Sequence, residues 1–212
     1  MTSVSFPAHY LHDAYKFVAG LKDPRTYLQS VHVEIPPGAE FATLVATNGN
    51  SMGIFRVPLT APSELLKGGT VFNLVLPQDP LKRCKQAKKK EEDLDVSICL
   101  LTGETHLDGK TIINTVHVVK FPDWRNVLRP LTGAKPGATR RVDIALLSEI
   151  ASVDPSDKPG VVQMARHGED GVMTVSLASR PDFFGLLMPV HVESEGHGYP
   201  TTANNQPFEV AL

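Results

Sequence analysis

The sequence contains little cysteine. Its two cysteines, Cys84 and Cys99, form no CxxC pair and are too few for a disulfide framework. Cytosolic proteins usually keep such thiols free, so we expect a cytoplasmic protein. No HExxH pattern or other His/Cys cluster with ligand spacing is present, and we therefore expect no metal site.

Long hydrophobic runs are also missing. No apolar segment approaches the roughly 20 residues of a membrane-spanning helix. The segment Met1–Ser5 has neither the basic region nor the apolar core of a signal peptide. We expect no contact with a membrane.

The usual signatures of catalysis are absent too. The sequence has no GxSxG, P-loop or Rossmann glycine pattern, and no acidic metal cluster of the kind a nuclease or hydrolase needs. We therefore expect no enzymatic activity and no cofactor. The net charge of −2 means that any contact with nucleic acid must come from a local basic face.

What is present is a repeated order of short strands and amphipathic helices. The first unit is predicted to hold a strand at 3–7, a helix at 8–22 and strands at 27–35, 41–47 and 52–57. Asn48-Gly49 between two of these strands predicts a tight hairpin.

Two further units follow. The second is predicted to have a strand at 70–76, a helix at 80–92 and strands at 95–102, 104–107 and 110–119. The third is predicted to have a strand passing into a helix over 139–151, then strands at 161–166, 172–178 and 184–192. Three βαβββ-like units predict an α+β fold: 1–130 as a domain of two units, 131–192 as an additional half-domain and 193–212 as a flexible tail.

One segment combines an aromatic residue, the single tryptophan and an arginine between two prolines, Phe121–Pro130. Pro122 and Pro130 disfavour a helix interior and predict an extended linking segment. Trp124 is expected to anchor a core or an interface.

The predicted helix 80–92 carries a run of cations. Lys82, Arg83, Lys85, Lys88, Lys89 and Lys90 lie close together on it. Such a run is commonly a solvated surface, and the alternative is contact with a phosphate backbone. The acidic residues Glu91–Asp93 directly after it oppose the second interpretation where they share its face.

Three separated apolar segments form a second candidate site. They lie around Thr47 and Met52, around Pro122 and Val127, and over Leu187–Val190. Brought together, they would make a shallow groove for a short hydrophobic peptide. Ordinary strand core is the alternative.

The order of these pieces resembles a known family. Arg25, Tyr27 and Leu28, then Ala46–Gly49, Phe121–Leu128 and Leu187–Val190, are similar in order and spacing to the bacterial β sliding clamp, the processivity subunit of replicative DNA polymerases. The match extends over about residues 4–192.

The resemblance implies a DNA-clamp fold of βαβββ units with helices on one face and antiparallel sheets on the other. It implies that the three helices face double-stranded DNA, without sequence preference, and that Lys82, Arg83, Lys85, Lys88 and Lys89 contact it. It further implies a pocket for short linear motifs of polymerase and clamp loader. The implied pocket residues are Thr47, Gly49, Met52, Pro122, Val127, Met188, Pro189 and Val190.

The sequence also departs from the family pattern. Asn50 and Ser51 stand where His and Arg are usual, Asn126 replaces a second Arg, and His191 replaces an Arg. A pocket without those cations would prefer a different peptide. Family chains hold six units and close as dimers, so three units here suggest a homo-oligomeric ring of four chains and a phage or plasmid origin.

A different class of function remains open. The chain could be a clamp-like interaction protein that binds a replication partner or a host clamp without encircling DNA. The end of the sequence, Gln206–Leu212, resembles a clamp-binding peptide, with a disordered end as the alternative.

Overall fold

The computed structural model describes residues 3–60, 71–77, 94–107, 110–113, 120–128, 142–154, 161–167 and 172–188. Its elements are β1 (Ser3–Pro7), α1 (His9–Tyr15), η1 (Thr26–Gln29), β2 (Ser30–Ile35), β3 (Phe41–Thr47), β4 (Ser51–Pro58), β5 (Phe72–Pro77), β6 (Asp95–Cys99), β7 (Thr105–Leu107), β8 (Lys110–Ile113), α3 (Arg125–Leu128), α4 (Ile144–Ala151), β9 (Val162–Arg166), β10 (Met173–Leu177) and β11 (Arg180–Leu187).

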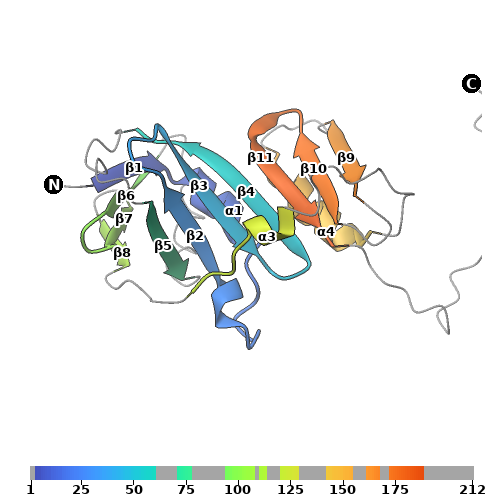
Figure 1. Ribbon diagram of the computed structural model, residues 1–212, viewed down its shortest axis with the longest axis horizontal. Helices are drawn as coiled ribbons and strands as arrows, with labels where there is room; N and C mark the ends of the chain where they lie inside the picture. The colour runs from blue at the N-terminus through green and yellow to red at the C-terminus, as the bar shows by residue number, and fades with distance from the viewer. Residues whose placement is uncertain are drawn as a thin grey trace, which may run out of the picture.

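The strands form two antiparallel sheets (Figure 1). The larger has seven strands in the order β5-β2-β3-β4-β11-β10-β9, and the smaller has four in the order β1-β6-β7-β8. The strand that opens each of the first two units therefore belongs to the other unit's sheet: β1 pairs with β6, and β5 pairs with β2. The larger sheet continues from β4 into β11 and so joins the first and third predicted units.

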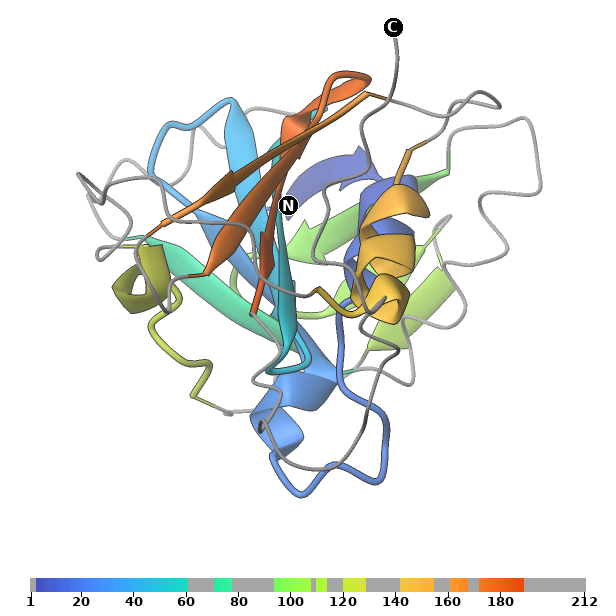
Figure 2. The same ribbon diagram turned by 90° about the vertical axis from the view of Figure 1, so that its right-hand side faces the viewer.

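Helices α1 and α4 lie side by side against one face of the large sheet (Figure 2). We call this the inner face and the opposite one the outer face. The main core lies between these helices and the two sheets, and alternate residues of each strand point into it. In β2, for example, Val31, Val33 and Ile35 point inward and are fully buried. This arrangement confirms the predicted α+β fold of antiparallel sheets with helices.

The hairpin prediction is confirmed. Thr47 pairs with Met52, and the turn between them contains Gly49 at φ +93°. Such a φ is strained for a residue with a side chain, which is why Asn-Gly signals this turn. The Asn48 side chain also accepts hydrogen bonds from the backbone N–H of Asn50 (2.9 Å) and of Ser51 (2.8 Å).

Helix α1 is shorter than the predicted 8–22, and α4 occupies the later part of 139–151, where a strand was predicted to pass into a helix. Helix α1 ends at Tyr15, and the chain continues in tight turns until the Ala19 N–H donates to the Leu28 carbonyl (2.8 Å). Helix α4 begins only at Ile144, because Asp143 is extended and caps the helix by accepting from the Ala145 N–H (2.8 Å). The apolar spacing identified the helices but not their ends.

The expectation of an extended segment at Phe121–Pro130 was wrong in part. Residues Arg125–Leu128 form one helical turn, α3, opened by an Asp123 carboxylate that accepts from the Arg125 N–H (3.2 Å). The two prolines forbid a long helix but leave room for a single turn between them. Helix α3 lies on the outer face, so only α1 and α4, among the helices that the structure describes, share the inner face.

The described residues contain no helix long and apolar enough to cross a membrane. The predicted cationic helix at 80–92 and the tail at 193–212 lie outside the described residues, as do Pro189 and Val190.

Candidate protein-binding site on the outer face

The candidate site lies where β4 meets β11. Met52 pairs with Leu186 and Ile54 pairs with Phe184, so these four side chains point to the outer face together. At the end of this seam the Met188 N–H donates to the Asn50 carbonyl (2.8 Å), which fixes Met188 beside the hairpin turn. Met188 remains 43% exposed, whereas Met52 is 8% exposed.

A second hydrophobic cluster, separate from the main core, covers this seam. We call it the outer-face cluster; its buried members are Val45, Met52, Val75, Phe121, Trp124 and Leu186, with Ile54, Val127, Leu128 and Val172 packed against them. Residues from four strands of the sheet thus meet the 121–128 segment here. In Figure 1, α3 lies over this part of the sheet.

The 121–128 segment is held to the sheet by β2. The Arg125 guanidinium donates to both carboxylate oxygens of Glu34 (2.8 and 2.5 Å) and lies 4.2 Å from the Trp124 ring centre. The Phe121 ring stacks on His32 at 5.1 Å with a 10° angle between the planes. His32 is therefore buried beneath this segment.

These contacts shift two pKa values. The hydrogen bond from Arg125 lowers the pKa of Glu34, and the guanidinium charge lowers it further against the opposing effect of burial. Burial lowers the pKa of His32, although Glu34 opposes that change. Glu34 therefore stays ionised and pairs with Arg125, while His32 is neutral and suits a stacked aromatic neighbour.

Six of the eight predicted pocket residues lie in the described part of the chain. Thr47, Gly49, Met52 and Met188 meet at the hairpin, and Val127 packs against the cluster that contains Met52. Pro122 is exposed and follows the buried Phe121. The structure therefore brings these three separated segments to one place. Whether they bind a peptide stays a prediction.

Sequence reasoning missed a cation at this site. The Arg25 guanidinium lies 2.9 Å from the position that a Cβ at Gly49 would occupy, so it extends over the hairpin turn. It pairs with Asp23 (2.8 Å), and the side-chain hydrogen bonds from Arg25 lower the pKa of Asp23 to about 2. Arg25 thus places a guanidinium, its charge balanced by Asp23, beside a hairpin in which Asn50 and Ser51 are neutral.

A hollow of about 520 Å³ adjoins the outer-face cluster. It shares Ile54 and Trp124 with that cluster, and the Arg56 guanidinium stands 3.9 Å from the Phe41 ring centre at its wall. The remaining lining residues are Pro36, Ala39, Glu40 and Thr43. The concave, mostly apolar surface thus extends along β3 and β4 beyond the seam.

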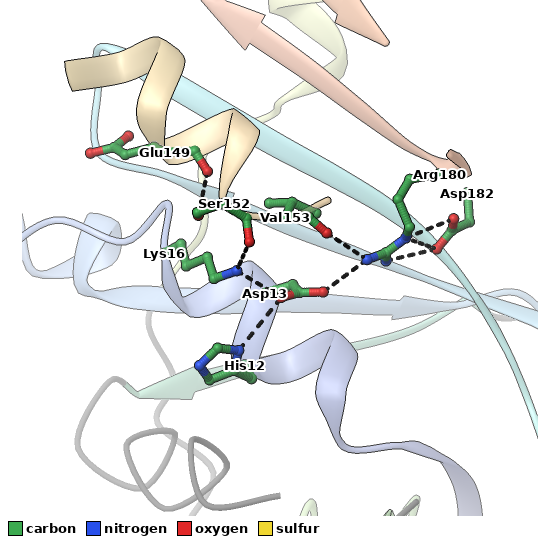
Figure 3. A network of polar contacts seen from close by, with 8 residues as sticks. All are labelled: His12, Asp13, Lys16, Glu149, Ser152, Val153, Arg180 and Asp182. Carbon is green, nitrogen blue, oxygen red and sulfur yellow. Dashed lines mark hydrogen bonds and ion pairs between the residues drawn. The ribbon is translucent and has the colours of Figure 1, made fainter. Parts of the chain in front are cut away.

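The inner face has a different character. A network of charges joins α1, β11 and the segment after α4 (Figure 3). Arg180 donates to Asp13 (3.0 Å), to the Val153 carbonyl (3.0 Å) and to Asp182 (2.9 Å), and Lys16 bridges Asp13 (3.0 Å) and the Ser152 carbonyl. We call this set the buried charge network, since Asp13 is 1% and Arg180 8% exposed.

The network controls three pKa values. Burial raises the pKa of Asp13, but its bonds to His12, Lys16 and Arg180 outweigh burial and hold it well below its usual range. Burial acts to lower the pKa of Arg180, but the hydrogen bonds and charges of Asp182 and Asp13 outweigh burial and raise that pKa above its usual value. Burial and the Asp182 charge raise the pKa of Tyr10 to about 12. All these groups keep their ordinary charge at neutral pH.

The described inner-face helices offer little positive charge for DNA. Neither α1 nor α4 contains Lys or Arg, and Lys16 after α1 belongs to the buried charge network. The outward side of α4 consists of Ile144, Ala145, Ser148 and Ala151. Lys82, Arg83, Lys85, Lys88 and Lys89 lie outside the described residues, so their contact with DNA stays a prediction.

Comparison with known proteins gives a clear match at the level of structure. The DNA polymerase III subunit beta from Pseudomonas aeruginosa superposes with a TM-score of 0.68 at 15% identity, covering 91% of this chain and 67% of that one. A DNA polymerase sliding clamp from Bacillus subtilis matches with a TM-score of 0.63 at 11% identity, covering 90% and 64%. A P. aeruginosa sliding clamp bound to griselimycin matches with a TM-score of 0.64 at 14% identity, covering 90% and 65%.

No family model matches the sequence, and no curated protein does. The paired antiparallel sheets and the helices between them define a protein with the DNA-clamp fold. More particularly, this is the fold of the bacterial β sliding clamps, as the sequence resemblance implied. The chain spans about two thirds of the length of those clamps.

Proposed function

We propose that this protein is a DNA sliding clamp, a non-enzymatic processivity factor that encircles duplex DNA as an oligomeric ring. The outer-face site binds short linear motifs of a polymerase or clamp loader. Retention on DNA comes from the closed ring, and weak, screened contacts from the lysines at 82–89 permit sliding.

The outer-face site is the observation that carries this proposal. Three segments far apart in the sequence meet at the β4–β11 seam, and two methionines border it. Methionine side chains are flexible and polarizable, so they adapt to varied apolar peptides. The Arg25 guanidinium, already paired with Asp23, adds further hydrogen-bond donors at the edge of the site.

Retention on circular DNA tests the ring. We expect the assembled protein to stay on nicked circular DNA through gel filtration and to leave when the DNA is linearised. Equal retention on circular and linear DNA would mean ordinary surface binding and would contradict encirclement.

The cationic segment is tested by Lys82→Ala/Lys85→Ala/Lys88→Ala. We expect weaker retention and a smaller dependence of binding on salt, with the slope reduced by up to about one unit for each phosphate that a removed lysine had neutralised. Lys120→Ala, an exposed lysine ahead of the outer-face segment, is the control and should change neither quantity. An unchanged salt slope in the triple variant would show that these lysines do not touch DNA.

Griselimycin is a suitable probe because one of the matched clamps is bound to it, and we expect it to occupy the outer-face site of this protein. We expect it to bind this protein, to quench or shift the fluorescence of Trp124, and to bind more weakly after Met188→Ala. Leu101→Ala, at an 81% exposed position on the β6–β7 connection, is the matched control. Equal affinity for all three proteins would place griselimycin away from the seam.

A second candidate function is a clamp-like adaptor that binds a replication partner without encircling DNA. The observation that favours it is the inner face, where neither α1 nor α4 presents a lysine or arginine. An adaptor would bind its protein partner and ignore circular and linear DNA alike, so the retention experiment separates the two functions.

A further inference from the structure

The hollow beside Trp124 lies toward the end of β3 and β4 that is opposite to the hairpin. Met52, Ile54 and Arg56 of β4 point to the outer face, because alternate residues of a strand share a face. Met52 lies at the hairpin end, and Arg56 lies at the wall of the hollow. They are four positions apart, roughly 13 Å along the strand at about 3.3 Å per residue. The hollow is therefore separate from the predicted pocket, although both lie on one strand.

Arg56 is a cation without a carboxylate partner in the described part of the chain. The other arginines whose side chains the structure describes, Arg25, Arg125 and Arg180, each pair with an aspartate or a glutamate. The Arg56 guanidinium lies over the Phe41 ring instead, 3.9 Å from the ring centre. Stacking on an aromatic face fixes the plane of a guanidinium and leaves its N–H donors available to an acceptor. Arg56 is thus an oriented donor group on the wall of a concave surface.

A second donor stands opposite Arg56. Thr43 of β3 pairs with Arg56 across the two strands, and both residues line the hollow. The Thr43 hydroxyl forms no hydrogen bond with the residues that the structure describes. A guanidinium and a hydroxyl that face each other on one surface suit a carboxylate, which accepts several hydrogen bonds. Glu40 also lines the hollow, but it is exposed and forms no ion pair with Arg56, so water screens its charge.

An exposed apolar strip joins the hollow to the β4–β11 seam. Ile54 and Trp124 belong both to the hollow and to the outer-face cluster. Ile54 pairs across the seam with Phe184, which points to the same face and is 36% exposed. The strip therefore runs from Met188 at the hairpin past Phe184 and Ile54 to the hollow. An extended peptide that follows it from the hairpin reaches Arg56.

We propose that the hollow is a subsite for an acidic residue of the same peptide that the seam binds. The carboxylate accepts hydrogen bonds from the Arg56 guanidinium and the Thr43 hydroxyl, while the carbon atoms of its side chain pack on Ile54 and Trp124. An extended chain covers about 3.3–3.6 Å per residue, so the acidic residue stands about four positions from the residue that contacts Met52. The proposal rests on peptide binding at the seam, and it adds the charge of the ligand and its spacing.

Selection from a displayed library of random peptides tests both the charge and the spacing. We expect the wild-type protein to enrich peptides in which Asp or Glu lies about four positions from a group of apolar residues. Arg56→Glu reverses the charge of the subsite and should enrich Lys or Arg at that position instead. Lys120→Glu makes the same change of charge at an exposed residue that does not line the hollow, and it should enrich the same acidic peptides as the wild type.

The affinity of one enriched peptide measures the contribution of Arg56. Arg56→Gln should weaken binding about fivefold, as expected for an exposed charge pair, and the loss should shrink in high salt. Replacing the acidic residue of the peptide by its amide should cost about as much, and both changes together no more than either, because each removes the same contact. Griselimycin should bind the wild type, Arg56→Gln and Arg56→Glu equally well, which shows that the variants have folded and that the seam is intact.

The acidic subsite would be overturned by enriched peptides without a charge preference, or with the same preference in the wild type and Arg56→Glu. Griselimycin binding that Met188→Ala weakens would then leave the seam site standing. Peptides whose affinity depends on Arg56 but not on Met188 would also overturn the proposal, because one ligand would not occupy both places. A protein that binds neither griselimycin nor any peptide would contradict the outer-face site itself.

Discussion

Replacing Asp13 by asparagine should destabilise the protein through the buried charge network. The substitution keeps the shape of the side chain but removes the charge that Arg180 and Lys16 face, each at 3.0 Å. Breaking one partner of a buried ion pair typically costs about 3–5 kcal/mol. Arg180 keeps Asp182 and the Val153 carbonyl, so we expect a loss at or just below the lower end of that range, about 2–3 kcal/mol.

Urea denaturation at neutral pH measures this loss. For a chain of this size the thermal midpoint should fall by about 5–10 °C, from about 2–4 °C per kcal/mol. Asp23→Asn is the matched control, because its carboxylate also pairs with an arginine at 2.8 Å but at the surface, where the gain is small. A loss below about 1 kcal/mol, or one equal to that of the control, would refute this account of the network.

The same substitution predicts a pH dependence with a definite sign. The folded-state pKa of Asp13 lies below its unfolded value of about 3.9, so the group adds stability above that pH. This contribution fades as pH falls below about 4 toward the folded-state pKa. The difference between the wild-type protein and Asp13→Asn should therefore be largest near neutral pH and shrink below about pH 4. A difference that grows on acidification would contradict the depressed pKa.

Two smaller perturbations address the rest of the fold. Arg125→Ala should cost about 1 kcal/mol, since the guanidinium is half exposed and water screens its pair with Glu34. The fluorescence of the single tryptophan should shift toward that of an exposed indole. An unchanged spectrum would contradict the role of this ion pair. Gly53→Ala should cost about 1–3 kcal/mol, because its Cβ would stand 2.6 Å from the Phe17 ring. Gly20→Ala, with nothing within 4 Å of the added Cβ, is the control in urea denaturation, and equal losses would contradict the close approach.

Local patterns predicted the strands well because their signals are local. Alternation of apolar residues over 41–47 and 52–57, together with Asn48-Gly49, sufficed for β3, β4 and the turn between them. The family resemblance added what alternation could not, namely that Met52, Val127 and Met188 belong to one site. Helix ends were less predictable: α1 ends at Tyr15, and tertiary hydrogen bonds such as that from the Ala19 N–H to the Leu28 carbonyl hold the chain that follows.

Long-range partners could not be predicted from the sequence. Asp13 and Arg180 are 167 positions apart, and neither lies in a pattern that indicates burial. His32 stands between the inward-facing Val31 and Val33 in an alternating strand, where a side chain is ordinarily exposed; the 121–128 segment covers it instead. The DNA-contacting lysines and the domain division at residue 130 stay predictions.

The seam between β4 and β11 is held from both sides by different forces. The outer-face cluster supplies apolar burial, which tolerates small changes in angle, whereas the ion pairs of Arg180 require fixed geometry. The buried charge network therefore sets the orientation of β9 to β11 relative to α1. Since the candidate pocket lies along β11, we infer that loss of the network would also disturb peptide binding at the β4–β11 seam.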